Sequence, residues 1–166
     1  QSGIYVVSNK VKHIDKGAFK DCKHITTLML GPTVTSINSG AFENCTGLLH
    51  MIIPPNVTKI EPGAFAGCTQ LCGVTVSADN IYFSSEDGAL FNKDKTTLIK
   101  CPEGSTTENY IIPDSVINIG GWAFKGCESL TSIAIPNSVT SICECAFCNC
   151  TSLISITIPD GVTSIC

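Results

Sequence analysis

The residues best suited to do chemistry in this sequence are four cysteines that fall within one short run. Cys143, Cys145, Cys148 and Cys150 stand in the segment C-E-C-A-F-C-N-C. Thiolates bind soft ions such as zinc or copper(I), and Cys143, Cys145 and Cys148 could supply three of them. No histidine lies nearby, and Cys150 belongs to a repeating column that we expect to be buried. We therefore predict no metal and no other cofactor, and we keep a metal or redox role for these three cysteines as a minor hypothesis.

Motifs typical of an enzyme are missing from the sequence. There is no Gly-x-Ser-x-Gly elbow, no His-Glu-x-x-His pair and no glycine-rich phosphate loop. The neighbouring acids Glu86 and Asp87 fall in an expected turn without an evident catalytic partner. We predict that the protein is not an enzyme.

The elements that must position the cysteines follow a 23-residue period. Ala-Phe pairs recur along the chain, and each is followed three residues after the Phe by a cysteine, namely Cys22, Cys45, Cys68, Cys127 and Cys150. Such a period indicates a solenoid, in which each repeat is one coil. The I-x-I and V-x-x-I stretches are short and β-branched, which favours two short strands per coil. The Gly, Asn or Asp before each of these cysteines tolerates a positive φ, as a single helical turn closed by a left-handed residue requires. The predicted fold class is an α/β solenoid of short parallel strands and single helical turns.

The period breaks once, in a unit that is longer than the others. Regular repeats cover about 4–76 and 110–166, and the irregular unit covers about 77–109, all within one domain of residues 1–166. In the irregular unit, Ala89 to Phe91 and Thr97 to Cys101 flank a polar tip. This arrangement predicts a β-hairpin.

Composition limits the classes of partner. The 166 residues include 10 Lys+Arg and 14 Asp+Glu, so the net charge is −4, and the mean hydropathy is +0.28. Only 14% of the residues are charged, which excludes the composition of a disordered chain. Without a basic run, the sequence does not favour nucleic acid or an anionic membrane surface. No apolar stretch reaches the length of a membrane span, so we expect no membrane insertion.

The candidate binding face lies on the first strand of each coil, where residues flanking the buried positions point outward. In the first three repeats the residues between the buried positions are Val6, Met29 and Ile52, an apolar row of the kind that marks a protein interface. The predicted protein-binding residues are Ile4, Val6, Thr27, Met29, His50, Ile52, Thr75 and Ile111. Trp122 replaces a glycine of its column, and we expect it either to anchor a partner or, preferably, to pack against the irregular unit.

A second hypothesis concerns the C-terminal end of the stack. The layer around Ile156, Ile158, Val162 and Ile165 has no visible polar cap. Solenoids need their last core layer covered, so the chain could be a structural protein that forms homo-oligomers through this end.

The repeat pattern IPxxVxxI followed by xxxAFxxCxxL strongly resembles the treponemal class of leucine-rich repeats, the BspA-like family. The resemblance covers essentially the whole chain, and DGALFNKDKTTLIKCP resembles the irregular unit that recurs in that family. It implies a right-handed leucine-rich-repeat horseshoe with a concave sheet and a secreted or surface-attached protein. It also implies adhesion to host extracellular matrix or cell-surface proteins, and with it virulence. Our leading hypothesis is therefore a non-catalytic protein-binding module.

Overall fold

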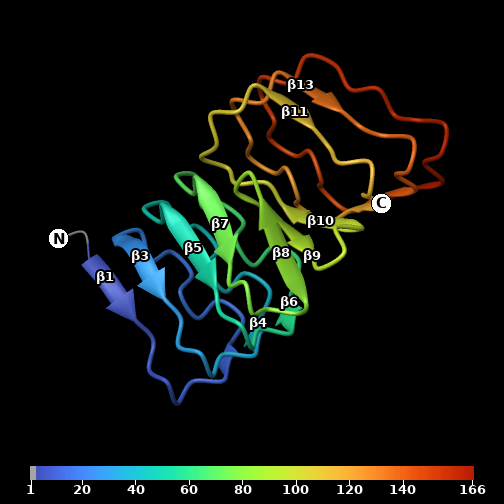
Figure 1. The fold of residues 1–166 in the computed structure, drawn as a ribbon. Coiled ribbons are helices and arrows are strands. Elements are labelled where there is room, and N and C mark those ends of the chain that lie inside the picture. The colour runs from blue at the N-terminus through green and yellow to red at the C-terminus, as the bar shows by residue number, and fades with distance from the viewer. Residues whose placement is uncertain (1–2) are drawn as a thin grey trace.

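The computed structural model describes residues 3–166 as a stack of coils whose strands repeat with the predicted period (Figure 1). In the first half, one parallel sheet has the order β1 (Gly3–Val6), β3 (Ile25–Met29), β5 (His50–Ile53) and β7 (Gly73–Val76). A second sheet contains β2 (His13–Ile14), β4 (Ser36–Ile37) and β6 (Lys59–Ile60). Each coil thus supplies one strand to each sheet, as predicted.

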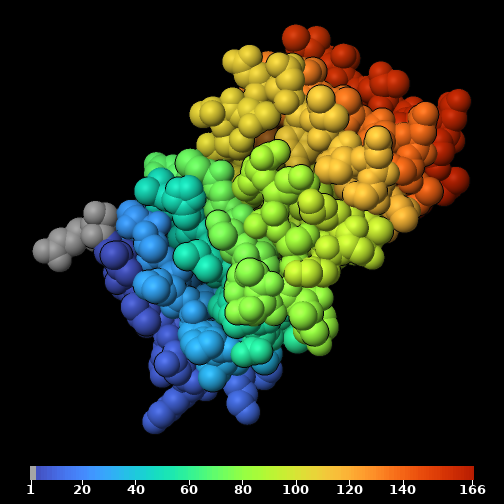
Figure 2. Space-filling view, in the orientation of Figure 1, coloured from blue at the N-terminus to red at the C-terminus, as the bar shows by residue number. Residues whose placement is uncertain are grey.

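The second half repeats this arrangement beyond the irregular unit. The first strands of its coils are β11 (Asn109–Ile111) and β13 (Ser132–Ala134), which pair in parallel. The second strands are β12 (Asn118–Ile119), β14 (Ser141–Ile142) and β15 (Ser164–Ile165). In the space-filling view, segments that are close in sequence lie close in space from one end of the body to the other (Figure 2).

The predicted single helical turns are wrong. Residues 3–166 contain no helix, and therefore none long and apolar enough to cross a membrane. In the A-F-x-x-C segments the backbone amides alternate between two kinds of partner. Ala18 N–H donates to Asp15 O within its own turn, at 3.0 Å, whereas Phe19 N–H donates to Ala41 O of the next coil, at 2.8 Å. Because every second amide bonds to the neighbouring coil, the segment forms successive β-turns instead of a helical turn.

The sequence correctly predicted one column of residues with positive φ and missed a second column. The residues before the repeating cysteines all have positive φ, namely Asp21, Asn44, Gly67, Gly126 and Asn149. A second column, four residues earlier, also has positive φ: Gly17, Gly40, Gly63, Trp122 and Cys145. Each of these residues is the third of a four-residue turn, as Gly17 is in Asp15–Ala18 and Asp21 is in Phe19–Cys22, and this is the position at which a type II turn has a positive φ.

The irregular unit is a three-stranded antiparallel meander of β8 (Phe83–Glu86), β9 (Ala89–Asn92) and β10 (Thr97–Lys100). The predicted hairpin of β9 and β10 forms, and β10 also pairs in parallel with β12, so it takes the place of a second strand of a coil. The sequence prediction missed β8. Its connection to β9 is the Asp87-Gly88 turn, where both residues have positive φ.

The core consists of two apolar clusters that meet at β9. Leu90 belongs to the cluster of the first half, together with Leu28, Phe42 and Phe65. Its neighbour Phe91 belongs to the cluster of the second half. Since successive side chains of a strand point to opposite sides, β9 forms the wall between the two halves of the core.

Candidate protein-binding face

The outer face of the sheet β1-β3-β5-β7 carries the apolar row. Val6 lies beside Met29 in register, and Ile52 lies beside Thr75. The exposed fractions are 72% for Val6, 49% for Met29 and 51% for Ile52. The residues between the outward positions, Leu28 and Met51, are fully buried. The row is therefore fixed on a packed sheet that points its apolar side chains into solvent.

The second predicted row is more polar. Ile4 is 70% exposed and pairs with Thr27, which in turn pairs with His50. His50 is exposed and Thr27 is half-buried, while the exposed Thr75 continues the first row beyond Ile52. The face thus combines a mostly apolar row with a neighbouring row that offers hydrogen-bonding groups.

Ile111 does not belong to this face, which corrects the prediction. It lies on β11, in the separate sheet β11-β13, although it is 79% exposed. The β8–β9 hairpin follows β7 and bonds to it, with Val74 N–H donating to Gly88 O at 2.8 Å. A cavity of about 510 Å³, lined by Glu86, Asp87 and Tyr110 among others, lies between the hairpin and β11. The meander therefore interrupts the row after β7.

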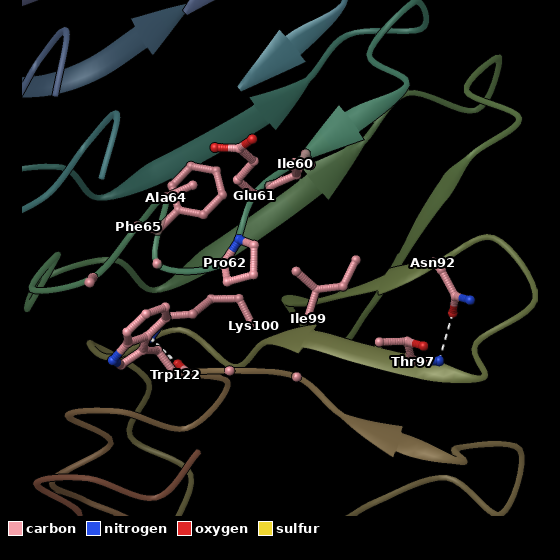
Figure 3. A pocket seen from close by; sticks show the side chains of 14 residues that line it. Ile60, Glu61, Pro62, Ala64, Phe65, Asn92, Thr97, Ile99, Lys100 and Trp122 are labelled. Atoms are coloured by element: carbon pink, nitrogen blue, oxygen red, sulfur yellow. Dashed lines mark hydrogen bonds between the residues drawn. The ribbon is translucent and has the colours of Figure 1, made fainter. Parts of the chain in front are cut away.

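Trp122 lies where the second sheet is also interrupted. Within residues 3–166, β6 pairs only with β4, and a cavity of about 270 Å³ separates it from β10 (Figure 3). The half-buried indole of Trp122 lines this cavity and lies over Gly63, whose Cβ, if present, would be 3.1 Å from the ring. The indole thus fills part of the space that a complete neighbouring turn would occupy. This position favours packing of Trp122 against the irregular unit over a role as an exposed anchor for a partner.

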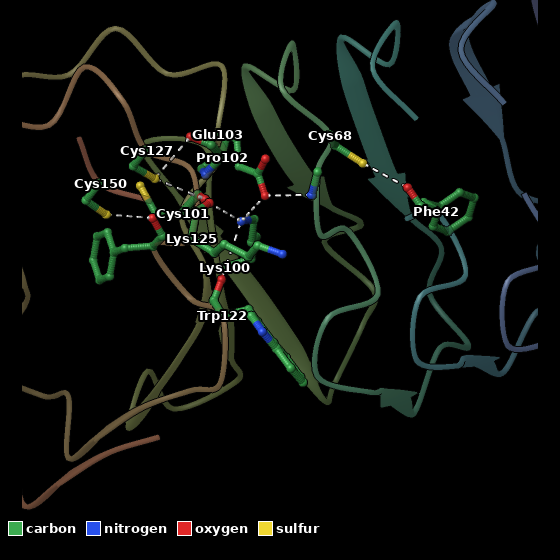
Figure 4. A network of polar contacts seen from close by, with 12 residues as sticks. Phe42, Cys68, Lys100, Cys101, Pro102, Glu103, Trp122, Lys125, Cys127 and Cys150 are labelled. Atoms are coloured by element: carbon green, nitrogen blue, oxygen red, sulfur yellow. Dashed lines mark hydrogen bonds and ion pairs between the residues drawn. The ribbon is translucent and has the colours of Figure 1, made fainter. Parts of the chain in front are cut away.

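A buried ion pair bridges the same interruption (Figure 4). Lys100 Nζ lies 3.0 Å from Glu103 Oε1, and the side chains are 5% and 2% exposed. The carboxylate accepts the Gly67 amide at 2.9 Å, and the ammonium donates to Lys125 O at 3.2 Å. In a regular stack, the amide in the position of Gly67 donates to the carbonyl in the position of Lys125, as Asp21 N–H does to Glu43 O. The pair therefore replaces a backbone hydrogen bond between coils.

The sequence prediction missed Lys100, Glu103 and Asn80, which is fully buried. The Asn80 side chain donates to Pro54 O and Val57 O and accepts the amides of Tyr82 and Phe83, so it fastens the irregular unit to the preceding coil. A signal for Lys100 was present, because the alternation in Thr97–Lys100 places it on the same side as the core residue Leu98.

The cysteines of the repeating column donate hydrogen bonds between coils. The thiols of Cys45 and Cys68 donate to the carbonyls of Phe19 and Phe42, at 3.0 and 3.1 Å. Cys150 likewise donates to Phe124 O at 3.0 Å, and burial raises the pKa of its thiol to about 11. All eleven cysteines are free thiols.

The hypothesis of a metal site at Cys143, Cys145 and Cys148 is not supported by their arrangement. Among the residues that the structure describes, no three His, Cys, Asp or Glu side chains converge in a way that could hold a metal ion.

Comparisons with known proteins agree with the architecture of stacked repeats. Residues 4–110 and 99–166 match the family model of the BspA type leucine rich repeat region, in six copies. A leucine rich cell surface protein from Faecalibacterium prausnitzii is 28% identical, with a TM-score of 0.77 over 98% of this chain and 49% of that chain. A leucine-rich repeat protein from Eubacterium ventriosum is 25% identical, with a TM-score of 0.71 over 98% of this chain and 55% of that chain.

The pneumococcal vaccine antigen PcpA is similar in fold, with a TM-score of 0.84 at 24% identity over 98% of this chain and 46% of that chain. This chain spans about half the length of each of the three solved proteins. None of the curated proteins matches its sequence. The family is generally a non-enzymatic repeat scaffold that serves in protein interactions. From its repeats, its stacked parallel strands and the match over its length, the chain belongs to the BspA-type leucine-rich-repeat family.

Proposed function

We propose that this chain is a non-catalytic module that binds a protein ligand through the outer face of the sheet β1-β3-β5-β7. The observation that carries the proposal is the exposed apolar row of Val6, Met29 and Ile52 on a rigid sheet. Exposed apolar groups in one contiguous row gain free energy when a partner covers them, since their contact with water is lost. Methionine adds adaptability, because its unbranched thioether fits irregular partner surfaces.

The ligand class that fits best is an extracellular matrix or cell-surface protein, bound in the manner of an adhesin. The description of the Faecalibacterium relative as a cell surface protein and of PcpA as a vaccine antigen supports a surface-exposed or secreted location. Thr27 and His50 beside the apolar row, and Thr75 at the end of that row, offer hydrogen bonds to the backbone or polar side chains of such a protein.

A binding titration against a panel of matrix and cell-surface proteins tests this proposal. The double variant Met29→Glu/Ile52→Glu places two charges on the face and leaves the buried side of the sheet unchanged. Ile117→Glu, at an exposed position in the second half of the stack, is the matched control. We expect saturable binding by the wild type and the control, and at least a tenfold weaker affinity for the double variant, because about 1.4 kcal/mol corresponds to a factor of ten. Equal binding by all three proteins would exclude this face as the site.

A second candidate function is self-association through the last coil. Ile154, Ile158 and Ile165 are exposed there, and residues 153–157 form no strand, although they correspond to the strands β11 and β13. Light scattering over a range of concentrations tests this candidate. An increase of mass with concentration that Ile154→Glu/Ile165→Glu abolishes would support assembly, and a monomer at all concentrations would refute it.

A further inference from the structure

One turn of the solenoid carries a cysteine at both ends. Cys148 N–H donates to Cys145 O at 3.2 Å, which closes a β-turn over Cys145-Ala-Phe-Cys148. A β-turn holds its first and fourth Cα atoms within about 7 Å, and a disulfide requires roughly 4.4–6.8 Å between them. The backbone of this turn is therefore compatible with a disulfide between its ends.

The equivalent turns of other coils measure how closely the side chains approach. A Cβ atom on Gly17 would lie 3.8 Å from Cβ of Lys20, and a Cβ atom on Gly40 would lie 3.7 Å from Cβ of Glu43. Both turns have the hydrogen bond of the Cys145 turn and the same positive φ at the first residue. The Cβ atoms of a disulfide are about 3.5–4.5 Å apart, with a mean near 3.8 Å. The repeat geometry thus places Cβ of Cys145 and Cys148 at the separation of a disulfide.

Cys145 is also unusual for its position. Three of the five residues in its column are glycine, and Cys145 adopts a φ of 51°. A side chain in this left-handed conformation costs roughly 1 kcal/mol relative to glycine. Both thiols are partly exposed, so a reagent in solution reaches them. The pKa of Cys148 lies above its ordinary value, chiefly through its interaction with the neighbouring thiol of Cys145.

We propose that Cys145 and Cys148 are a redox site that forms a reversible disulfide across the turn, with a low-molecular-weight disulfide as the oxidant. The thiolate of one cysteine attacks a sulfur of the oxidant and releases one small thiolate, which leaves a mixed disulfide. The second protein thiol loses its proton and attacks the protein sulfur of that mixed disulfide, so that the second small thiolate leaves. The protein loses two electrons and two protons, and the oxidant is reduced to two thiols. This site is independent of partner binding at the sheet.

Redox titration of the folded protein tests the proposal. The background variant Cys72→Ser/Cys166→Ser removes the two exposed cysteines, which would otherwise link separate molecules. This protein is incubated with mixtures of oxidised and reduced glutathione, quenched with acid, alkylated and mapped by peptide mass spectrometry. We expect a cross-link between Cys145 and Cys148 as the first protein disulfide, with Cys143 still open to alkylation, and its reversal by reduced glutathione. Links of Cys143 to either residue instead, or glutathione adducts on both residues without a cross-link, would overturn the proposal.

Two variants separate the turn geometry from thiol reactivity alone. In Cys145→Ser, Cys148 should stop at the mixed disulfide with glutathione. In Cys145→Ser/Glu144→Cys the number of thiols is unchanged, but one cysteine is moved from the first residue of the turn to the residue before it. Cross-linking in this second variant should fall at least tenfold at equal oxidant, and equally efficient cross-linking would show that the turn has no special role.

Discussion

Lys100 and Glu103 show how single side chains maintain a repeating hydrogen-bond pattern where the repeat fails. Glu103 accepts the amide of Gly67, and Lys100 donates to the carbonyl of Lys125, so both backbone groups remain bonded although the intervening turn is missing. Breaking a buried pair leaves one uncompensated charge, which costs far more than breaking a pair at the surface. We therefore expect the Lys100–Glu103 pair to stabilise the junction between the two halves of the stack.

Lys100→Met should lower the free energy of unfolding by about 3–5 kcal/mol, because the Glu103 carboxylate stays buried without its counter-ion. Lys20→Met is a matched control, since Lys20 also lies 3.0 Å from a glutamate, but with side chains 47% and 38% exposed. That variant should unfold at nearly the wild-type denaturant concentration. Urea titration followed by circular dichroism measures both, and equal midpoints would contradict a special role for the buried pair.

The partly buried thiol of Cys150 predicts a loss of stability at alkaline pH. Burial raises the pKa of Cys150 from 9.0 to about 11, so the folded state disfavours the thiolate. Below pH 9 the thiol is protonated in both states and its contribution is fully present. Between pH 9 and about 11 the unfolded chain releases the proton first, so the free energy of unfolding falls as pH rises. Urea midpoints on both sides of pH 9 measure this effect, and Cys150→Ala should lessen the fall. A midpoint that does not change with pH would refute this assignment.

At the scale of elements, the sequence shows the turn between β8 and β9 but not the strand that precedes it. Asp-Gly is a strong signal for a two-residue hairpin turn, and Asp87 and Gly88 both have positive φ. The strand before it, Phe83-Ser-Ser-Glu86, contains only one apolar residue, so its sequence shows no alternation of apolar and polar residues. Pattern alone therefore did not mark β8 as a strand.

Gly88→Ala should destabilise the meander by about 1–2 kcal/mol, since its φ is +79° and the new Cβ would lie 3.3 Å from Cys72 O and Gly73 Cα. Hydrogen exchange should speed up at the Val74 amide, which donates to Gly88 O. Asp87→Asn is the control, because Asn suits this turn equally well. Unchanged exchange at Val74 in the glycine variant would show that the turn does not hold β7.

For the whole molecule, the two core clusters predict two partly independent units of stability. Repeat proteins unfold with nearest-neighbour coupling, so damage in one half affects that half most. Leu90 and Phe91 are adjacent and both fully buried, yet they belong to different clusters.

Leu90→Ala should speed hydrogen exchange chiefly in residues 28–74, and Phe91→Ala chiefly in residues 112–146. Each should cost about 2–5 kcal/mol through an unfilled cavity. Exchange measured by mass spectrometry on both variants serves as a reciprocal control. Uniform acceleration over the whole chain in both would mean that the stack unfolds as a single cooperative unit.

The sequence by itself determined the period, the stacking of parallel strands, the left-handed residues before the cysteines and the outward row of Val6, Met29 and Ile52. All of these follow from spacing within one repeat, since the position of a residue in its coil decides which side it faces. The tertiary structure decided the rest. The helical turn was lost because Phe19 and Asp21 bond to carbonyls of the next coil, on Ala41 and Glu43, a competition that no local pattern reports.

The same reason accounts for Ile111, Lys100 and the cysteine turn. Ile111 has the right place in its repeat, but the meander separates its strand from β7. Lys100 is buried because Gly67 N–H and Lys125 O, which are far apart in sequence, do not bond to each other where the turn is missing. Glu103 accepts the first group and Lys100 donates to the second. The approach of Cys145 to Cys148 depends on a β-turn in place of a helical turn. Each of these features depends on which coils become neighbours, and only the folded stack fixes that.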